Sequence, residues 1–71
     1  MKYIVIEIQV NWDGTVGNLV TAHDSREQAE SKYHAVLSAA AVSKIMKHSA
    51  VIMDEEGAVY GSMCYRHEME A

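Results

Sequence analysis

Hydrophobic and polar residues alternate along residues 2–10, which is typical of a β-strand. One set of alternate positions holds the branched residues Ile4, Ile6, Ile8 and Val10. The other set holds Tyr3, Val5, Glu7 and Gln9. Successive side chains of a strand point to opposite faces of a sheet. We therefore predict a strand over 2–10 whose isoleucine face packs against the rest of the protein.

The pattern after this strand predicts a turn, a second strand and a helix. The Asp-Gly signal at 11–14 indicates a tight turn, and 15–23 is the returning strand, with Gly17 as a possible bulge site. The helix is expected to begin at Asp24 or Ser25, which can cap its first amides, and to end near Ser43. Its apolar stripe is formed by residues at helical spacing: Ala29, Tyr33, Val36, Leu37 and Ala40.

Two more strands follow the helix, over 48–54 and 58–68, with a turn at 55–57 between them. The order ββαββ predicts an α+β fold, in which a four-stranded antiparallel sheet carries one helix packed on one face. The last strand offers two alternate sets. The more apolar set should face the helix and consists of Val59, Gly61, Met63, Tyr65 and His67. The other set contains Tyr60, Ser62, Cys64 and Arg66.

A chain of 71 residues is a single domain, over 1–71, with a small core. Its one cysteine, Cys64, rules out an internal disulfide, so self-association is the expected supplement to stability. The helix is rich in alanine, which is explained either by close packing on the sheet alone or by a second contact with another subunit. The second explanation predicts a homo-oligomer with interface residues on the outer surface of the helix: His34, Ala35, Ala39, Ala41 and Val42.

Charge and hydropathy limit the ligands and the cellular location that we expect. The net charge of −4 lacks the positive field that attracts nucleic acid, so direct nucleic-acid binding is not expected. The N-terminus lacks the long apolar segment of a signal peptide, and no run reaches the roughly 20 apolar residues of a membrane span. With a single thiol, this predicts a cytoplasmic protein that does not interact with membranes.

Catalytic and metal-binding patterns are weak, so we predict neither catalytic nor metal-ligating residues and no cofactor. Cys64 and His67 are three residues apart, and on a strand such residues point to opposite faces. No glycine-rich phosphate loop occurs, and the carboxylates at 54–56 are typical of a solvated turn. The sequence therefore favours a protein that binds over an enzyme.

Three phrases of the chain resemble small proteins of phages and mobile elements of Gram-positive bacteria. They are "DG-x-VGNLVT", "AESKYH-x-VL-x-AAAVS" and "HSAV-x-x-DEEG". Proteins of that kind are often counter-defence factors that act by stoichiometric binding. The resemblance therefore implies that the protein works in the cytoplasm of a bacterial host. The resemblance carries no catalytic motif, so it transfers no functional residue, and what it implies is an analogy of function.

The analogy leaves two binding functions open. The first is a homo-oligomer that sequesters a nucleotide-derived immune signal. Its expected ligand residues are Arg66 for the anionic group and Tyr3, Trp12 and Tyr60 for stacking on a base. The second is an acidic protein that inhibits a host defence protein, as anti-CRISPR proteins do. Strong dependence of complex formation on salt would favour the second.

Overall fold

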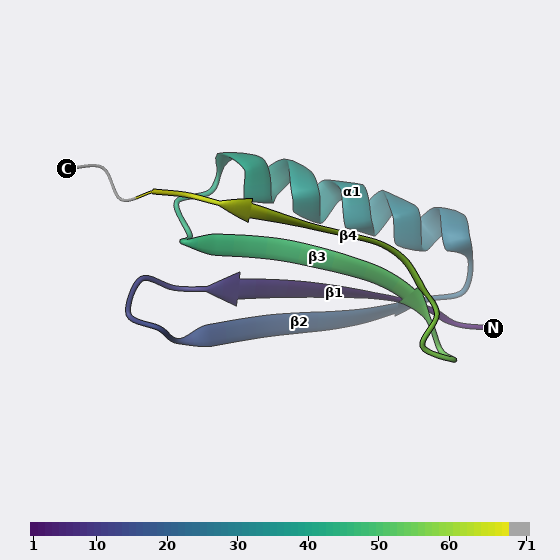
Figure 1. Cartoon of the computed structure of the whole chain (residues 1–71). Helices are drawn as coiled ribbons and strands as arrows, with labels where there is room; N and C mark the ends of the chain where they lie inside the picture. Colours follow the sequence, from purple (N-terminus) through teal and green to yellow (C-terminus); the bar gives the residue numbers. More distant parts are fainter. Residues whose placement is uncertain (69–71) are drawn as a thin grey trace.

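The computed structural model describes residues 1–68 and has the predicted ββαββ order. The elements are β1 (Tyr3–Val10), β2 (Val16–His23), α1 (Arg26–Val42), β3 (Lys47–Asp54) and β4 (Val59–Arg66). The four strands form one sheet in the order β2-β1-β3-β4, and every neighbouring pair is antiparallel. The helix lies along one face of this sheet (Figure 1). The predicted α+β class is therefore confirmed.

The helix begins and ends where its capping residues predict. Ser25 is the N-cap, and its hydroxyl accepts a hydrogen bond of 3.2 Å from the backbone N–H of Gln28. Ser43 is the C-cap, and both its backbone N–H and its hydroxyl donate to the carbonyl of Ala40. Each cap therefore gives a hydrogen-bond partner to a backbone group near one end of α1, where partners within the helix run out.

The two hairpin turns depend on glycine. Gly14 and Gly57 have φ values of +88° and +89°, a region in which a Cβ atom is strained. The expected bulge at Gly17 is absent, because Gly17 pairs with Gln9 in an unbroken register. The irregularity lies instead between β3 and β4, where Met53 pairs with Val59 and Ile52 pairs with Gly61, so that Tyr60 is the additional residue.

The prediction for the two faces of β1 was wrong. Val5 is only 1% exposed and forms the core cluster with Ala29 of the helix and Ile52 of β3. The set that contains Val5 therefore faces α1, and the isoleucine set points away from it. Alanines at the closest approach of the helix leave room for Val5. The carboxylate of Glu7, in the same set, can lie on this face because it has a hydrogen-bond partner in His48.

The face of the sheet opposite α1 is largely apolar. Cross-strand partners share a face of a sheet, so the register places the partners of the isoleucine set there. We call this surface the open sheet face. Its larger apolar residues are Ile4, Ile6, Ile8, Val10, Val16, Val20, Val51, Met53 and Val59. Within residues 1–68, no helix or strand covers it, and Val16, Val20 and Val59 are more than half exposed.

The last strand divides largely as predicted. Gly61, Met63 and Tyr65 pair with helix-facing residues of β3. At Gly61 the ring of Tyr33 takes the place of a side chain, since a Cβ atom there would lie 3.4 Å from the Tyr33 hydroxyl. The bulge reverses the first two positions, so Val59 lies on the open sheet face and Tyr60 lies on the helix side. Those two placements were predicted wrongly.

Candidate functional site

The four predicted ligand residues fall at opposite ends of the sheet. Tyr3 and Tyr60 come together, with ring centroids 6.0 Å apart and an interplanar angle of 37°. Arg66 pairs with Lys47, which also pairs with Val10 at the other end of β1. One protomer therefore brings the two tyrosines together but does not place Arg66 beside them.

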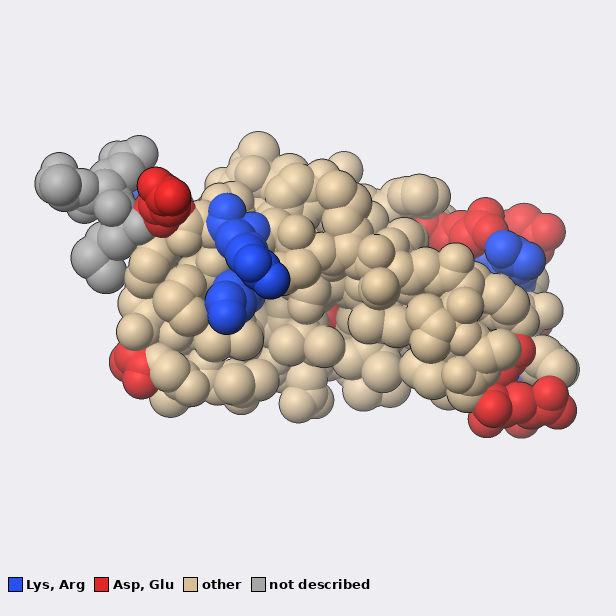
Figure 2. Space-filling view, viewed as in Figure 1, with Lys and Arg blue, Asp and Glu red and all other residues tan. Residues whose placement is uncertain are grey.

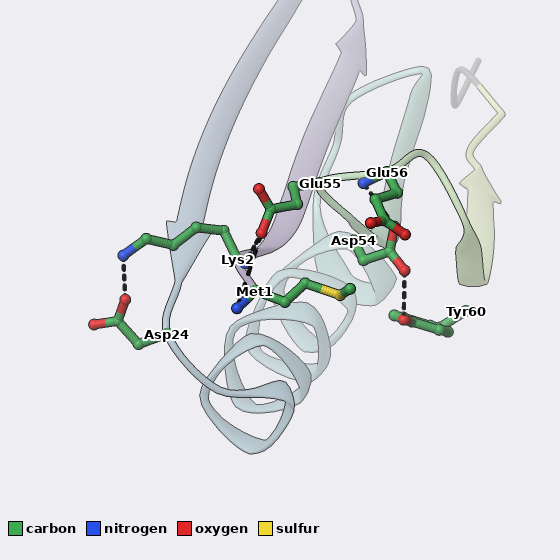
Figure 3. Close-up of polar contacts among 7 residues, drawn as sticks. All are labelled: Met1, Lys2, Asp24, Asp54, Glu55, Glu56 and Tyr60. Atoms are coloured by element: carbon green, nitrogen blue, oxygen red, sulfur yellow. Dashed lines mark hydrogen bonds and ion pairs between the residues drawn. The ribbon is translucent and has the colours of Figure 1, made fainter.

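Two charged residues that the sequence reasoning missed complete the tyrosine cluster. The guanidinium carbon of Arg26 lies 4.5 Å from the ring centroid of Tyr60, in a cation–π contact. The Tyr60 hydroxyl donates a hydrogen bond of 2.7 Å to Asp54 (Figure 3). Arg26 comes from the first turn of α1 and Asp54 from the end of β3. Because the cluster depends on long-range pairing and on the bulge, no local motif identifies it.

Asp54 holds both the β3–β4 turn and Tyr60. One carboxylate oxygen accepts hydrogen bonds from the backbone N–H groups of Glu56 (2.9 Å) and Ala58 (3.1 Å), and the other accepts from Tyr60. The bond from Tyr60 is the main cause that lowers the pKa of Asp54, and these backbone donors lower it further. The same bond raises the pKa of Tyr60. Asp54 is therefore held ionised, and Tyr60 is held in one orientation.

The cluster lies at an end of the protein where carboxylates gather. We call this region the acidic end. It contains Asp24, Glu27, Glu30, Asp54, Glu55 and Glu56, from the start of α1 and the β3–β4 turn. Two side-chain cations of the described chain lie among them, Lys2 and Arg26, and the N-terminal ammonium lies 3.9 Å from Glu55. Counted by side chains, six carboxylates and two cations leave four negative charges in excess, which equals the net side-chain charge of the whole chain. The N-terminal ammonium lowers the local excess to three.

Ion pairs fasten the N-terminus to the acidic end. The ammonium group of Lys2 pairs with Asp24, and the backbone N–H of Lys2 donates to Glu55 (Figure 3). Figure 2 shows most of the acidic surface in that view at the end of the molecule that carries the N-terminus, and a basic patch towards the other end. The protein is thus polarised along its strands, which its modest net charge does not reveal.

The opposite end holds the other two predicted ligand residues. Trp12 lies in the β1–β2 turn, and its indole N–H donates a hydrogen bond of 2.9 Å to the carbonyl of Lys44. This bond fastens the turn to the segment between α1 and β3. Arg66 is exposed on the open sheet face beside Lys47. We call Lys47 and Arg66 the basic pair.

The predicted interface residues lie on the outer surface of the helix. His34, Ala35, Ala39, Ala41 and Val42 are all exposed, and Val42 is 83% exposed. The residues that pack on the sheet are Ala29, Val36 and Ala40. The alanines of α1 are thus divided between two surfaces, and those on the outer one are available to a partner.

A buried polar network lies beneath the C-terminal end of the helix. His48 is 3% exposed; its Nε2 lies 2.6 Å from Glu7 Oε2, and its Nδ1 lies 3.2 Å from Ser43 Oγ. In a catalytic triad the serine hydroxyl gives its proton to the imidazole. Here the Ser43 hydroxyl donates its proton to the carbonyl of Ala40 in the helix cap, so it does not donate that proton to His48. The network therefore anchors the helix to the sheet.

A recess of about 290 Å³ opens beside this network. Its lining consists of Glu7, Gln9, Gly17, Asn18 and Leu19. The ionisable side chain among these five is the carboxylate of Glu7, so the recess does not favour an anionic ligand. In residues 1–68, no cluster of three or more histidine, cysteine or carboxylate side chains is placed to hold a metal ion.

No helix within the described residues combines the length and the apolar character needed to cross a membrane. Comparison of the chain with protein-family models, curated proteins and solved structures found no match.

Proposed function

We propose that the protein acts by stoichiometric binding to another protein that has a basic surface, and that the acidic end makes the contact. The observation that carries the proposal is the segregation of charge: counted by side chains, the acidic end holds all of the excess negative charge of the chain. Complementary charge speeds association and selects partners. A basic protein surface is the macromolecular ligand that fits such a field.

The centre of the acidic end has the composition of a protein-binding surface. Tyr60 is exposed, is held rigid by Asp54 and carries the guanidinium of Arg26 on its ring. Tyrosine and arginine are enriched among the residues that dominate binding energy, and charged residues typically form the rim around them. An ordered aromatic centre with an acidic rim loses little conformational freedom when a partner binds.

The same geometry bears on sequestration of a nucleotide. The pair of Tyr3 and Tyr60 offers a surface on which a base can stack, which agrees with the function of nucleotide sequestration. The surrounding carboxylates repel phosphate, and Arg66 lies at the other end of the protomer. Binding to a protein is therefore the function that we favour. Inhibition of a host defence protein, which the resemblance to counter-defence factors implies, is a role of this kind.

A pair of charge reversals tests the proposal. Glu27→Lys changes the acidic end, and Glu68→Lys makes the same change of charge beyond the end of β4. Reversal at Glu27 costs the helix only about 0.5 kcal/mol through its dipole, so both variants should stay folded. The immobilised wild-type protein and both variants are exposed to a lysate of the organism that carries the gene, and retained proteins are eluted with salt and identified.

We expect the wild type and Glu68→Lys to retain a basic protein that Glu27→Lys does not retain. Because charge holds the complex together, moderate salt should release this protein. Calorimetry with that purified protein then gives the stoichiometry. Retention that is equal for both variants would contradict the use of the acidic end. Calorimetry against linear and cyclic nucleotides provides the other arm. Submillimolar binding that is abolished by Tyr60→Ala would replace our proposal with sequestration of a nucleotide.

A further inference from the structure

The core between helix and sheet is thin for the number of apolar residues in the chain. The buried hydrophobic residues among 1–68 are three alanines, two valines and one isoleucine. The larger apolar residues of β1, by contrast, point to the open sheet face. A contiguous exposed apolar surface of this kind marks an interaction site rather than a solvated surface.

We propose that a second copy of the chain covers the open sheet face, with the two sheets stacked face to face and their strands antiparallel. This inference concerns a different surface from the acidic end and does not depend on the function proposed above. Two observations support a second copy as the occupant: the area of the face and the distribution of charge at its ends.

The area is sufficient for a specific dimer. Four strands of eight residues, rising about 3.3 Å per residue and lying about 4.8 Å apart, give a face of about 500 Å². Two such faces bury about 1,000 Å² together, which reaches the lower bound for a specific interface. The face carries branched side chains at its centre, where Ile6 lies between Val20 and Val51. Sheets pack through interdigitation of side chains like these.

Charge selects the antiparallel arrangement. The basic pair, Lys47 and Arg66, lies at one end of the open sheet face, and Glu55 and Glu56 follow β3 at the other end. Figure 2 shows a broad uncharged stretch between the basic patch and the acidic surface. When the strands of two copies run in opposite directions, each basic pair lies against the partner's β3–β4 turn. When they run in the same direction, the two basic pairs gather at one end of the dimer and the two β3–β4 turns gather at the other, so like charges share each end. The first arrangement is favoured by complementary charge.

A matched pair of substitutions tests which surface associates. Val20→Glu puts a carboxylate on the open sheet face at a residue that is 57% exposed in the protomer, so the fold should tolerate it. Ala39→Glu puts the same group on the outer surface of the helix, where the sequence predicted an interface. Equilibrium sedimentation at micromolar concentrations should show a dimer for the wild type and for Ala39→Glu, and a folded monomer for Val20→Glu. A wild type that is monomeric up to millimolar concentration would overturn the proposal, as would dissociation by Ala39→Glu alone.

A double charge reversal tests the orientation. We expect Lys47→Glu with Arg66→Glu to weaken the dimer by about tenfold at low salt, since attraction becomes repulsion at both ends, and we expect the effect to fade at high salt. In the parallel arrangement, reversal replaces a group of positive charges at one end of the dimer with a group of negative charges, so repulsion between like charges is present before and after it. An unchanged dimer constant at low salt would therefore overturn the antiparallel arrangement. Circular dichroism of each variant establishes that it is folded.

Discussion

Val5 and Val10 lie on the same strand and on opposite faces of the sheet, so replacing each with alanine measures what each face contributes to stability. Val5 is 1% exposed and contacts the helix through the core cluster. Val10 lies on the open sheet face and is partly exposed in the protomer. Both substitutions remove the same two methyl groups and the same β-propensity. Any difference between them therefore reports burial.

The cost at Val5 follows from its burial. Two methyl groups at about 0.8 kcal/mol each, with a residual cavity of about 50 Å³ at about 24 cal/mol per Å³, give a loss of about 3 kcal/mol. A protein of this length has a free energy of unfolding of about 4–11 kcal/mol, so the loss is a large fraction of it. At Val10, where the protomer leaves the side chain partly in water, we expect a loss of less than about 1 kcal/mol.

Urea denaturation followed by circular dichroism provides the assay. The experiment is performed at one low protein concentration, so that association contributes equally little to both variants. We expect the midpoint for Val5→Ala to fall well below that for Val10→Ala, with similar slopes. Equal midpoints, or a lower midpoint for Val10→Ala, would refute the assignment of the faces of β1.

Three further predictions concern single contacts. Gly61→Val should destabilise the protein by about 1–3 kcal/mol, measured by urea denaturation, because the new side chain meets the hydroxyl of Tyr33; an unchanged midpoint would contradict that contact. Ser25→Ala should cost about 1 kcal/mol through loss of the helix cap, and no loss would mean that the cap is satisfied otherwise. The hydrogen bond from Tyr60 lowers the pKa of Asp54 below its ordinary value of 3.8. The ionised Asp54 therefore stabilises the fold fully at neutral pH, and this stabilisation is lost as the pH falls below 3.8. Asp54→Asn should lack this part of the loss of stability in acid, and an acid unfolding curve that is the same as that of the wild type would contradict the prediction.

Local signals in the sequence predicted the elements well. The helix begins at Arg26, directly after the capping Ser25, and ends at Val42, directly before Ser43, because the hydrogen bonds of its ends depend on neighbouring residues. The four strands lie within about one residue of their expected starts, since alternation and turn glycines are also local. These features need no knowledge of which strands pair.

The faces of β1 were harder to predict, because both alternate sets contain apolar residues. The sequence predicted that the isoleucine set was buried and that Glu7 lay on the face away from the helix. Its partner His48 lies 41 residues further along the chain, so nothing local indicates that the carboxylate is satisfied there. The narrow, alanine-rich stripe of the helix was the signal available, as it indicates a close approach to small side chains.

The candidate site was predicted in part. Two of its aromatic residues, Tyr3 and Tyr60, were selected from composition alone, but Arg26 and Asp54 were not. A bulge of one residue brings Tyr60 to the helix side. Gly61 stands directly beside it, and a glycine within a strand can mark a bulge, but Gly61 was expected to lie in a regular strand. The acidic end was likewise hidden, since its carboxylates come from segments about 30 residues apart.

The most direct test of the account measures the solvent accessibility of side-chain methyl groups by nuclear magnetic resonance, with a soluble paramagnetic agent, as the protein concentration is raised. We predict that the methyl groups of Val5 and Ile52 are protected at every concentration. Those of Ile4, Ile6 and Ile8 should be accessible in dilute protein and become protected as the open sheet face is covered by a second copy. Protection of the isoleucines together with exposure of Val5 at the lowest concentration would contradict the account.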